Sequence, residues 1–228
     1  MTTPPRRLAP GDRRRQILSM ARELLDFKSL DDITVEEAAE RAGVSPGLVF
    51  HYFGTQRKFR RAIAEEVAQE LLVQLAPDPA LSHVEQLRGA LDRFTDYVAK
   101  RPELFLAVTR VAGASQDLRD LHAAIRSTLA DWLVEALCDV GVDDTPALHA
   151  TISGWIAYTE EVVLDWLTGQ TLARLEVVSL CESACYHLVQ AVVGDEERWR
   201  RIAAGLARRP GAPTTRRKPA APDTTVRE

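Results

Sequence analysis

Residues 34–58 read TVEEAAERAGVSPGLVFHYFGTQRK, and the stretch carries the start and stop signals of two short helices. Thr34 lies three residues before a glutamate, which is the spacing of a capping box at a helix start. Gly43 can adopt the left-handed conformation that ends a helix. Ser45 can cap a second helix, with Pro46 at its first position, where a missing N–H costs nothing. The stretch therefore predicts a helix, a glycine turn and another helix.

Two helices joined in this way form a helix-turn-helix unit. The second helix of that unit enters the major groove of DNA, with its N-terminal residues nearest the base edges. Gly47 would let the backbone approach a duplex closely. His51 and Tyr52 can each donate a hydrogen bond to a phosphate oxygen, and Leu48 can pack against a thymine methyl. Because few of these side chains can make bidentate base contacts, we expect specificity to rest partly on phosphate positioning and DNA shape.

The segment AERAGVSPGLVFHYF, preceded by Thr34 and followed by a basic helix start, resembles the tetracycline-repressor (TetR/AcrR) family of bacterial transcriptional regulators. The resemblance covers roughly residues 12–65. It implies an all-α fold with an N-terminal three-helix DNA-binding head and a larger C-terminal helical body for effector binding and dimerisation. Together, the chemistry and the resemblance place the DNA contacts at Thr34, Ser45, Pro46, Gly47, Leu48, His51, Tyr52, Arg57 and Lys58.

Three positions depart from the pattern of that family. Ala38 stands where a larger aliphatic residue is usual, and Phe50 stands where tyrosine is usual. Gln56 stands where a lysine usually meets a DNA phosphate. Arg57 and Lys58 could supply that contact instead, because cations at a helix N-terminus are mildly unfavourable without an external anion. The alternative is that they form a solvated face.

The core of the head is expected from the inward-facing residues of the same helices. Val49, Phe50 and Phe53 are interpreted as core residues rather than DNA contacts. The rest of the chain shows helical periodicity and no strand alternation bounded by hairpin turns. Helices are predicted over 12–27, 55–75, 82–100, 102–114, 117–140, 145–168, 171–194 and 195–207. We divide the chain into a disordered arm (1–11), the DNA-binding domain (12–55), the effector-binding and dimerisation domain (56–207) and a disordered tail (208–228).

Charge is divided unevenly along the 228 residues, whose formal net charge is −4. Residues 1–65 hold 12 Lys/Arg and 9 Asp/Glu, a net of +3, whereas residues 66–194 hold 8 and 19, a net of −11. A basic head can neutralise phosphates, while an acidic body repels the duplex and helps to orient the head. Neither a signal peptide nor a run of about 18 apolar residues occurs. We therefore expect a cytoplasmic protein with double-stranded DNA, and no membrane, as partner.

The body is predicted to dimerise and to hold a small-molecule effector. By resemblance, the helices over 145–168 and 171–194 pair across a two-fold axis, and their apolar residues cover arcs wide enough for burial on two sides; the alternative is a central position in a monomer. The expected dimer residues are Ile152, Ile156, Val163, Leu167, Val178, Cys185, Val189 and Val192. The expected cavity residues are Phe94, Tyr97, Phe105, Thr109, Trp132, Trp155, Tyr158 and Thr159, each of which could instead be ordinary core.

Two further clusters have a plain and a functional interpretation. Glu160, Glu161 and Asp165 would select cations inside a pocket, but a solvated face is the preferred interpretation. Cys181 and Cys185 lie one turn apart and could bind zinc or sense oxidation, but structural zinc needs four ligands. We interpret them as small buried hydrophobes and expect neither a metal nor a cofactor.

The function expected from these features is that of a homodimeric repressor, released from a palindromic operator by an unknown small-molecule effector. An all-helical enzyme is one alternative, but the sequence offers no glycine-rich phosphate loop, nucleophile elbow or recognisable catalytic carboxylate pair. An effector-free architectural DNA-binding protein is the other.

Overall fold

The computed structural model describes residues 9–109, 116–169 and 171–210. The described residues form helices joined by turns and contain no strand. The α-helices are α1 (Pro10–Glu23), α2 (Val35–Ala42), α3 (Pro46–Phe53), α4 (Gln56–Leu75), α5 (His83–Lys100), α6 (Pro102–Thr109), α7 (Gln116–Asp139), α8 (Pro146–Gly169), α9 (Arg174–Val193) and α10 (Glu196–Leu206), with short 3-10 helices at Leu24–Asp26 and Leu30–Asp32. The predicted all-α class is confirmed.

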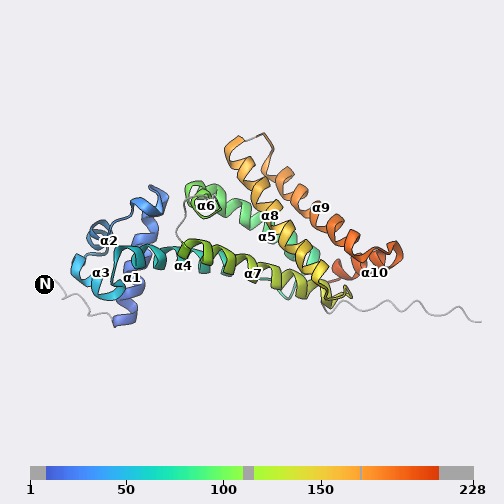
Figure 1. Ribbon diagram of the computed structural model, residues 1–228, viewed down its shortest axis with the longest axis horizontal. Coiled ribbons are helices and arrows are strands. Elements are labelled where there is room, and N and C mark those ends of the chain that lie inside the picture. Colours follow the sequence, from blue (N-terminus) through green and yellow to red (C-terminus); the bar gives the residue numbers. More distant parts are fainter. Residues whose placement is uncertain (1–8, 110–115, 170, 211–228) are drawn as a thin grey trace, which may run out of the picture.

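Helices α1, α2 and α3 form a small head against the first turns of α4 (Figure 1). Ile17 of α1, Ile33 before α2, Val49 of α3 and Phe59 of α4 are all fully buried there. Each of these residues comes from a different segment, so burying them together fixes the relative positions of the four segments. The core of the head is thus formed by residues of the head and of the first turns of α4.

The first helix differs from its predicted bounds of 12–27. It begins at Pro10, which takes the first helical position after the extended Ala9, and it ends at Glu23. The 3-10 turn that follows keeps Leu24 and Leu25 buried while redirecting the chain. Of the predicted arm, residues 1–8 lie outside the described part of the chain, and residues 10 and 11 belong to α1.

The body surrounds a cavity with α4, α5, α6, α7 and α8, while α9 packs on α5 and α8. Figure 1 shows α8 and α9 running side by side, with α10 at the end furthest from the head. Thr145 accepts a hydrogen bond from the Leu148 N–H at 3.2 Å, so the predicted cap opens α8. Residues 211–228 of the predicted tail and residues 110–115 after α6 lie outside the described part.

A chain of charged side chains joins the head to the body. Glu70 of α4 pairs with Arg22 of α1 at 2.5 Å and with Arg101, just after α5, at 3.7 Å. Arg101 also reaches Asp26 of the head at 3.3 Å, and its guanidinium lies over the ring of Tyr97. These contacts link the orientation of the head to α4 and α5 together.

Candidate functional site

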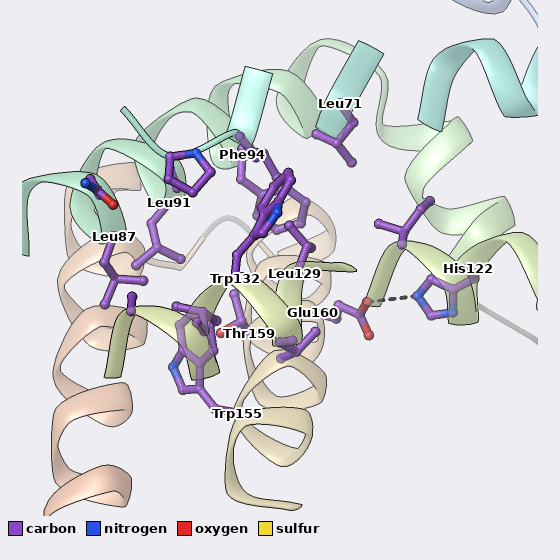
Figure 2. A pocket seen from close by; sticks show the side chains of 18 of the residues that line it. Leu71, Leu87, Leu91, Phe94, His122, Leu129, Trp132, Trp155, Thr159 and Glu160 are labelled. Atoms are coloured by element: carbon purple, nitrogen blue, oxygen red, sulfur yellow. Dashed lines mark hydrogen bonds and ion pairs between the residues drawn. The ribbon is translucent and has the colours of Figure 1, made fainter. Parts of the chain in front are cut away.

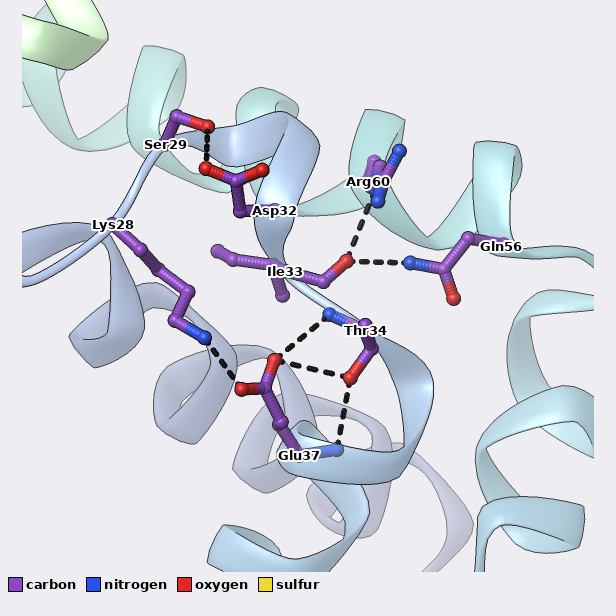
Figure 3. Close-up of polar contacts among 8 residues, drawn as sticks. All are labelled: Lys28, Ser29, Asp32, Ile33, Thr34, Glu37, Gln56 and Arg60. Atoms are coloured by element: carbon purple, nitrogen blue, oxygen red, sulfur yellow. Dashed lines mark hydrogen bonds and ion pairs between the residues drawn. The ribbon is translucent and has the colours of Figure 1, made fainter.

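The helix-turn-helix is held by the caps that the sequence predicts. The Glu37 N–H donates to the Thr34 hydroxyl at 3.2 Å, and the Thr34 N–H donates to the Glu37 carboxylate at 3.2 Å (Figure 3). The hydrogen bonds from Lys28 and Thr34 hold the pKa of Glu37 below its ordinary value. Gly43 has φ = 65°, the left-handed conformation that ends α2. The Leu48 N–H donates to the Ser45 hydroxyl and so caps α3.

The first residues of α3 are exposed, as reading a groove requires. Ser45, Pro46, Gly47 and His51 are exposed, whereas Leu48 is half-buried. A Cβ added at Gly47 would approach only the Ser45 hydroxyl, at 4.0 Å. Packing within the protein therefore leaves room for a side chain at this position and does not itself require a glycine.

Tyr52 and Phe50, both on α3, differ in how deeply they are buried. Tyr52 is half-buried against the core, and its ring meets that of His51 edge-on at 5.5 Å. Val49 and Phe53 are buried as predicted, but Phe50 is 41% exposed, so its assignment to the core is wrong. Val49 and Phe53 lie one helical turn apart on the inner face, which turns Phe50 outward. Its spacing from Gly47 could have revealed this, and its ring could contact thymine methyl groups.

The start of α4 presents cations but uses Gln56 internally. Arg57 and Lys58 are exposed, next to the Thr55 hydroxyl that caps the helix. Gln56 instead accepts from the Val35 N–H at 3.0 Å. It also donates to the Ile33 carbonyl at 2.5 Å (Figure 3). At the position where the resembled family has a phosphate-binding lysine, this chain ties α4 to the entry of α2.

The body holds a cavity of about 170 Å³ with predominantly apolar walls (Figure 2). Six of the eight predicted cavity residues line it: Phe94, Phe105, Thr109, Trp132, Trp155 and Thr159. Tyr97 is buried between α4 and α5, and burial raises its pKa, whereas Tyr158 is exposed on the outside of α8. Sequence periodicity located the helices correctly but did not distinguish these two faces.

Polar residues close one end of the cavity. Glu160 lines it and contacts the ring of His122 at 2.8 Å and Arg126 at 3.5 Å. Glu161 and Asp165 are exposed, so the three acidic residues do not form one cluster inside the cavity. The cavity wall also includes Leu71 and Leu75 from the last turns of α4, which the prediction did not include.

Most of the predicted dimer residues lie inside the protomer, so six of the eight need correction. Six are buried in the single chain: Ile152, Ile156, Val163, Val178, Cys185 and Val189. Leu167 and Val192 are half-buried and pack on the same core. The outward faces of α8 and α9 instead expose Tyr158, Leu175, Leu180 and Leu188. The wide apolar arcs of α8 and α9 indicated burial on two sides of each helix. They did not show which side packs on the core of the protomer and which side remains outside.

The cysteines are shielded rather than poised for reaction. Cys181 and Cys185 are buried free thiols. Burial, assisted by the nearby Glu182 charge, raises the pKa of Cys185 to about 12, and burial also raises the pKa of Cys181. Thiolates are the reactive and metal-binding form. Within the described residues, no group of three or more His, Cys, Asp or Glu side chains could hold a metal ion.

Sequence comparisons match both parts of this architecture. Residues 17–67 match the family model "Bacterial regulatory proteins, tetR family", and residues 83–190 match "Tetracyclin repressor-like, C-terminal domain". The HTH-type transcriptional regulator BetI of Escherichia coli is 31% identical over 146 residues, covering 64% of this chain and 53% of the relative. BetI of Vibrio vulnificus is 28% identical over 119 residues, covering 49% and 57% respectively. The chain thus spans about half the length of these curated relatives.

Solved structures agree on the fold. A tetR-family transcriptional regulator from Streptomyces coelicolor superposes with a TM-score of 0.72 at 24% identity, covering 87% of this chain and 91% of that one. The transcriptional regulator FadR from Bacillus subtilis, solved in complex with stearoyl-CoA, gives 0.56 at 20% identity, covering 77% and 97%. Among the described helices, none combines the length and apolarity needed to cross a bilayer. The head, the body and both family matches lead to one conclusion: the chain belongs to the tetR family of bacterial regulatory proteins.

Proposed function

We propose that this regulator is a cytoplasmic homodimeric repressor that binds a palindromic operator and is released when a small molecule enters the body cavity. The observation that carries the proposal is the course of α4. Its first turn presents Arg57 and Lys58 beside the recognition helix, and its last turns supply Leu71 and Leu75 to the cavity wall. A change in the cavity that moves one end of this helix also moves the other.

Two heads are needed because one recognition helix reads too few base pairs to be specific. A two-fold dimer would place the two α3 helices roughly 34–36 Å apart, or a multiple of that distance, along the duplex. The outward faces of α8 and α9 suit such pairing. They combine exposed apolar side chains, Tyr158, Leu180 and Leu188, with exposed small residues that permit close helix approach, Ala150, Gly154, Ala157, Ser179 and Ser183.

Release requires the effector to bind one body conformation better than another, because a ligand with equal affinity for both shifts nothing. The apolar cavity wall supports an effector that is at least partly hydrocarbon. The stearoyl-CoA held by the Bacillus subtilis FadR is a molecule with a long apolar chain, which is compatible with this class of effector.

Selection of genomic fragments by the purified protein tests the proposal. Retained fragments should share an inverted repeat, and a fragment carrying it should outcompete bulk DNA at fixed salt concentration, since non-specific affinity depends steeply on salt. If no fragment is preferred over bulk competitor, operator recognition is refuted. If the inverted repeat is bound by a single protomer per site, the homodimer is refuted.

A further inference from the structure

The cavity contains a polar atom that the protein leaves without a hydrogen bond. Thr159 of α8 is 5% exposed, and its Oγ1 forms no hydrogen bond within the described part of the chain. The hydroxyl lies near the Cys181 thiol. Burial raises the pKa of that thiol, and the nearby hydroxyl partly offsets the rise. No hydrogen bond of normal geometry joins the two. A buried hydroxyl without a partner is costly, and this one lines the cavity beside Trp132 and Trp155 (Figure 2).

Two other polar side chains of the cavity wall already have partners. The Trp155 indole N–H donates to the Cys181 carbonyl at 2.8 Å, and the Thr109 hydroxyl donates to the Phe105 carbonyl at 2.7 Å. His83 is an exception, because its Nδ1 is also buried and unpaired. Thr159 is therefore a residue of the cavity wall whose hydroxyl has no hydrogen bond within the described part of the chain, and a small rotation of its side chain would present that hydroxyl to a ligand.

The charges around the cavity disfavour a charged ligand. The residues lining it include no lysine or arginine, and their one carboxylate belongs to Glu160. That carboxylate is engaged by His122, which also lines the cavity, and by Arg126. An anion would be buried near Glu160 with no lysine or arginine in the wall to pair with, and an ammonium would have to compete with Arg126. Either charge would lose its hydration without compensation.

We propose that the cavity takes an uncharged, mostly hydrocarbon molecule whose single oxygen hydrogen-bonds to Thr159. A ketone, ester or alcohol would satisfy the hydroxyl while its hydrocarbon part contacts Leu71, Leu91, Phe94 and Trp132. The inference deepens the proposed function, because it gives the chemical class of effector for the same cavity.

Eight-carbon probes that differ only in their polar group test whether the cavity prefers an uncharged ligand. Octan-2-one, octane, octanoate and octylamine are titrated against the full-length protein, with intrinsic tryptophan fluorescence as the readout, since Trp132 and Trp155 line the cavity. We expect saturable binding of octan-2-one, with octanoate and octylamine binding more weakly. Tighter binding of either charged probe overturns the proposal, as does the absence of saturable binding by octan-2-one.

Variants of one residue test the contact. Thr159→Val removes the hydroxyl at nearly constant volume and should weaken octan-2-one binding roughly three- to tenfold while leaving octane unchanged. Thr159→Ser keeps the hydroxyl and should retain ketone binding, and Tyr158→Phe is a control on the outside of the same helix. Equal affinities of the wild-type protein and both Thr159 variants, with circular dichroism confirming their fold, would overturn the role of Thr159.

Failure of this inference is separable from failure of the proposed function. Operator binding is measured without probe, on the same preparations. If the wild-type protein selects an inverted repeat and octanoate, rather than octan-2-one, releases it, the repressor proposal stands and the uncharged ligand is refuted. If no operator is selected while octan-2-one binds through Thr159, the ligand class stands and the repressor proposal is refuted.

Discussion

The side-chain amide of Gln56 bridges the two residues that flank Thr34, accepting from the Val35 N–H at 3.0 Å and donating to the Ile33 carbonyl at 2.5 Å. Arg60, one turn later on α4, donates to the same carbonyl at 3.0 Å. These bonds attach the start of α4 directly to the first residues of the helix-turn-helix, so the angle between α2 and α4 does not depend on apolar packing alone.

Replacing Gln56 with alanine should lower the free energy of unfolding by about 1–2 kcal/mol, because the Val35 N–H loses its partner and the Ile33 carbonyl keeps only Arg60. Chemical denaturation of the full-length protein measures the change. Lys58→Ala, two residues away and exposed, is the matched control and should leave stability within about 0.5 kcal/mol. Equal stabilities of the two variants would mean that water replaces Gln56 without cost.

Lys58→Ala should weaken binding to every duplex alike, because a lysine that meets phosphate carries no sequence information. The slope of log affinity against log salt should fall in magnitude by about 1. Fluorescence anisotropy over a salt series measures both effects. Arg200→Ala on α10, at the end of the molecule furthest from the head, removes the same charge and should leave the slope unchanged (Figure 1). Identical slopes for Lys58→Ala and the wild-type protein would remove the phosphate contact.

Leu180→Glu and Leu188→Glu should convert the proposed dimer into monomers, because each places a charge in the centre of an apolar helix face. Both leucines are about 40% exposed in the single chain, so the substitutions leave the protomer core intact. Light scattering after size exclusion gives the mass. Val73→Glu on α4, where the valine is 66% exposed, adds the same charge elsewhere and should remain dimeric. Dimers of normal mass from both leucine variants would show that another surface pairs.

Glu85 gives the protein a pH-dependent contribution to stability. Hydrogen bonds from Arg209 and from the backbone and side chain of Ser82 lower its pKa to about 2, from an ordinary value of 4.5. Since the folded-state pKa is the lower one, the contribution is complete above pH 4.5 and is lost as the pH falls towards 2. Melting temperatures of the wild type and Glu85→Gln should therefore differ most above pH 4.5 and converge in acid. Glu66→Gln, at an exposed position on α4, is the control. A difference in melting temperature between the wild type and Glu85→Gln that stays constant with pH would contradict the role given to Glu85.

Local signals predicted the head well because its caps are short-range. The Thr34 box, the left-handed Gly43 and the Ser45 cap each depend on a few neighbouring residues, and the structure contains all three. The predicted bounds of the first helix were less accurate, since Pro10 can stand either in an extended arm or at the start of a helix. The outward position of Phe50 follows from helical geometry, but its aromatic character suggested the core.

The body was less predictable because the face that each of its helices buries depends on packing against segments distant in the sequence. Ile152 and Val189 are fully buried by packing within the protomer, a fact that periodicity along one helix cannot supply. The same limit explains why Tyr158 was placed in the cavity while Leu71 was missed. The unpaired hydroxyl of Thr159 depends on the positions of several helices at once and has no local sequence signal.

The pairs formed by Arg22, Asp26, Glu70 and Arg101 have a consequence for any measurement of operator affinity. They join head to body through partly exposed charges, which dissolved ions screen. Added salt therefore acts in two places, at the phosphates of the duplex and at the protein's own hinge. If these pairs favour the DNA-bound orientation of the head, a titration that counts only released counterions will overestimate the number of phosphates touched. The excess should shrink when Arg101 is replaced by methionine, which removes two of the three pairs.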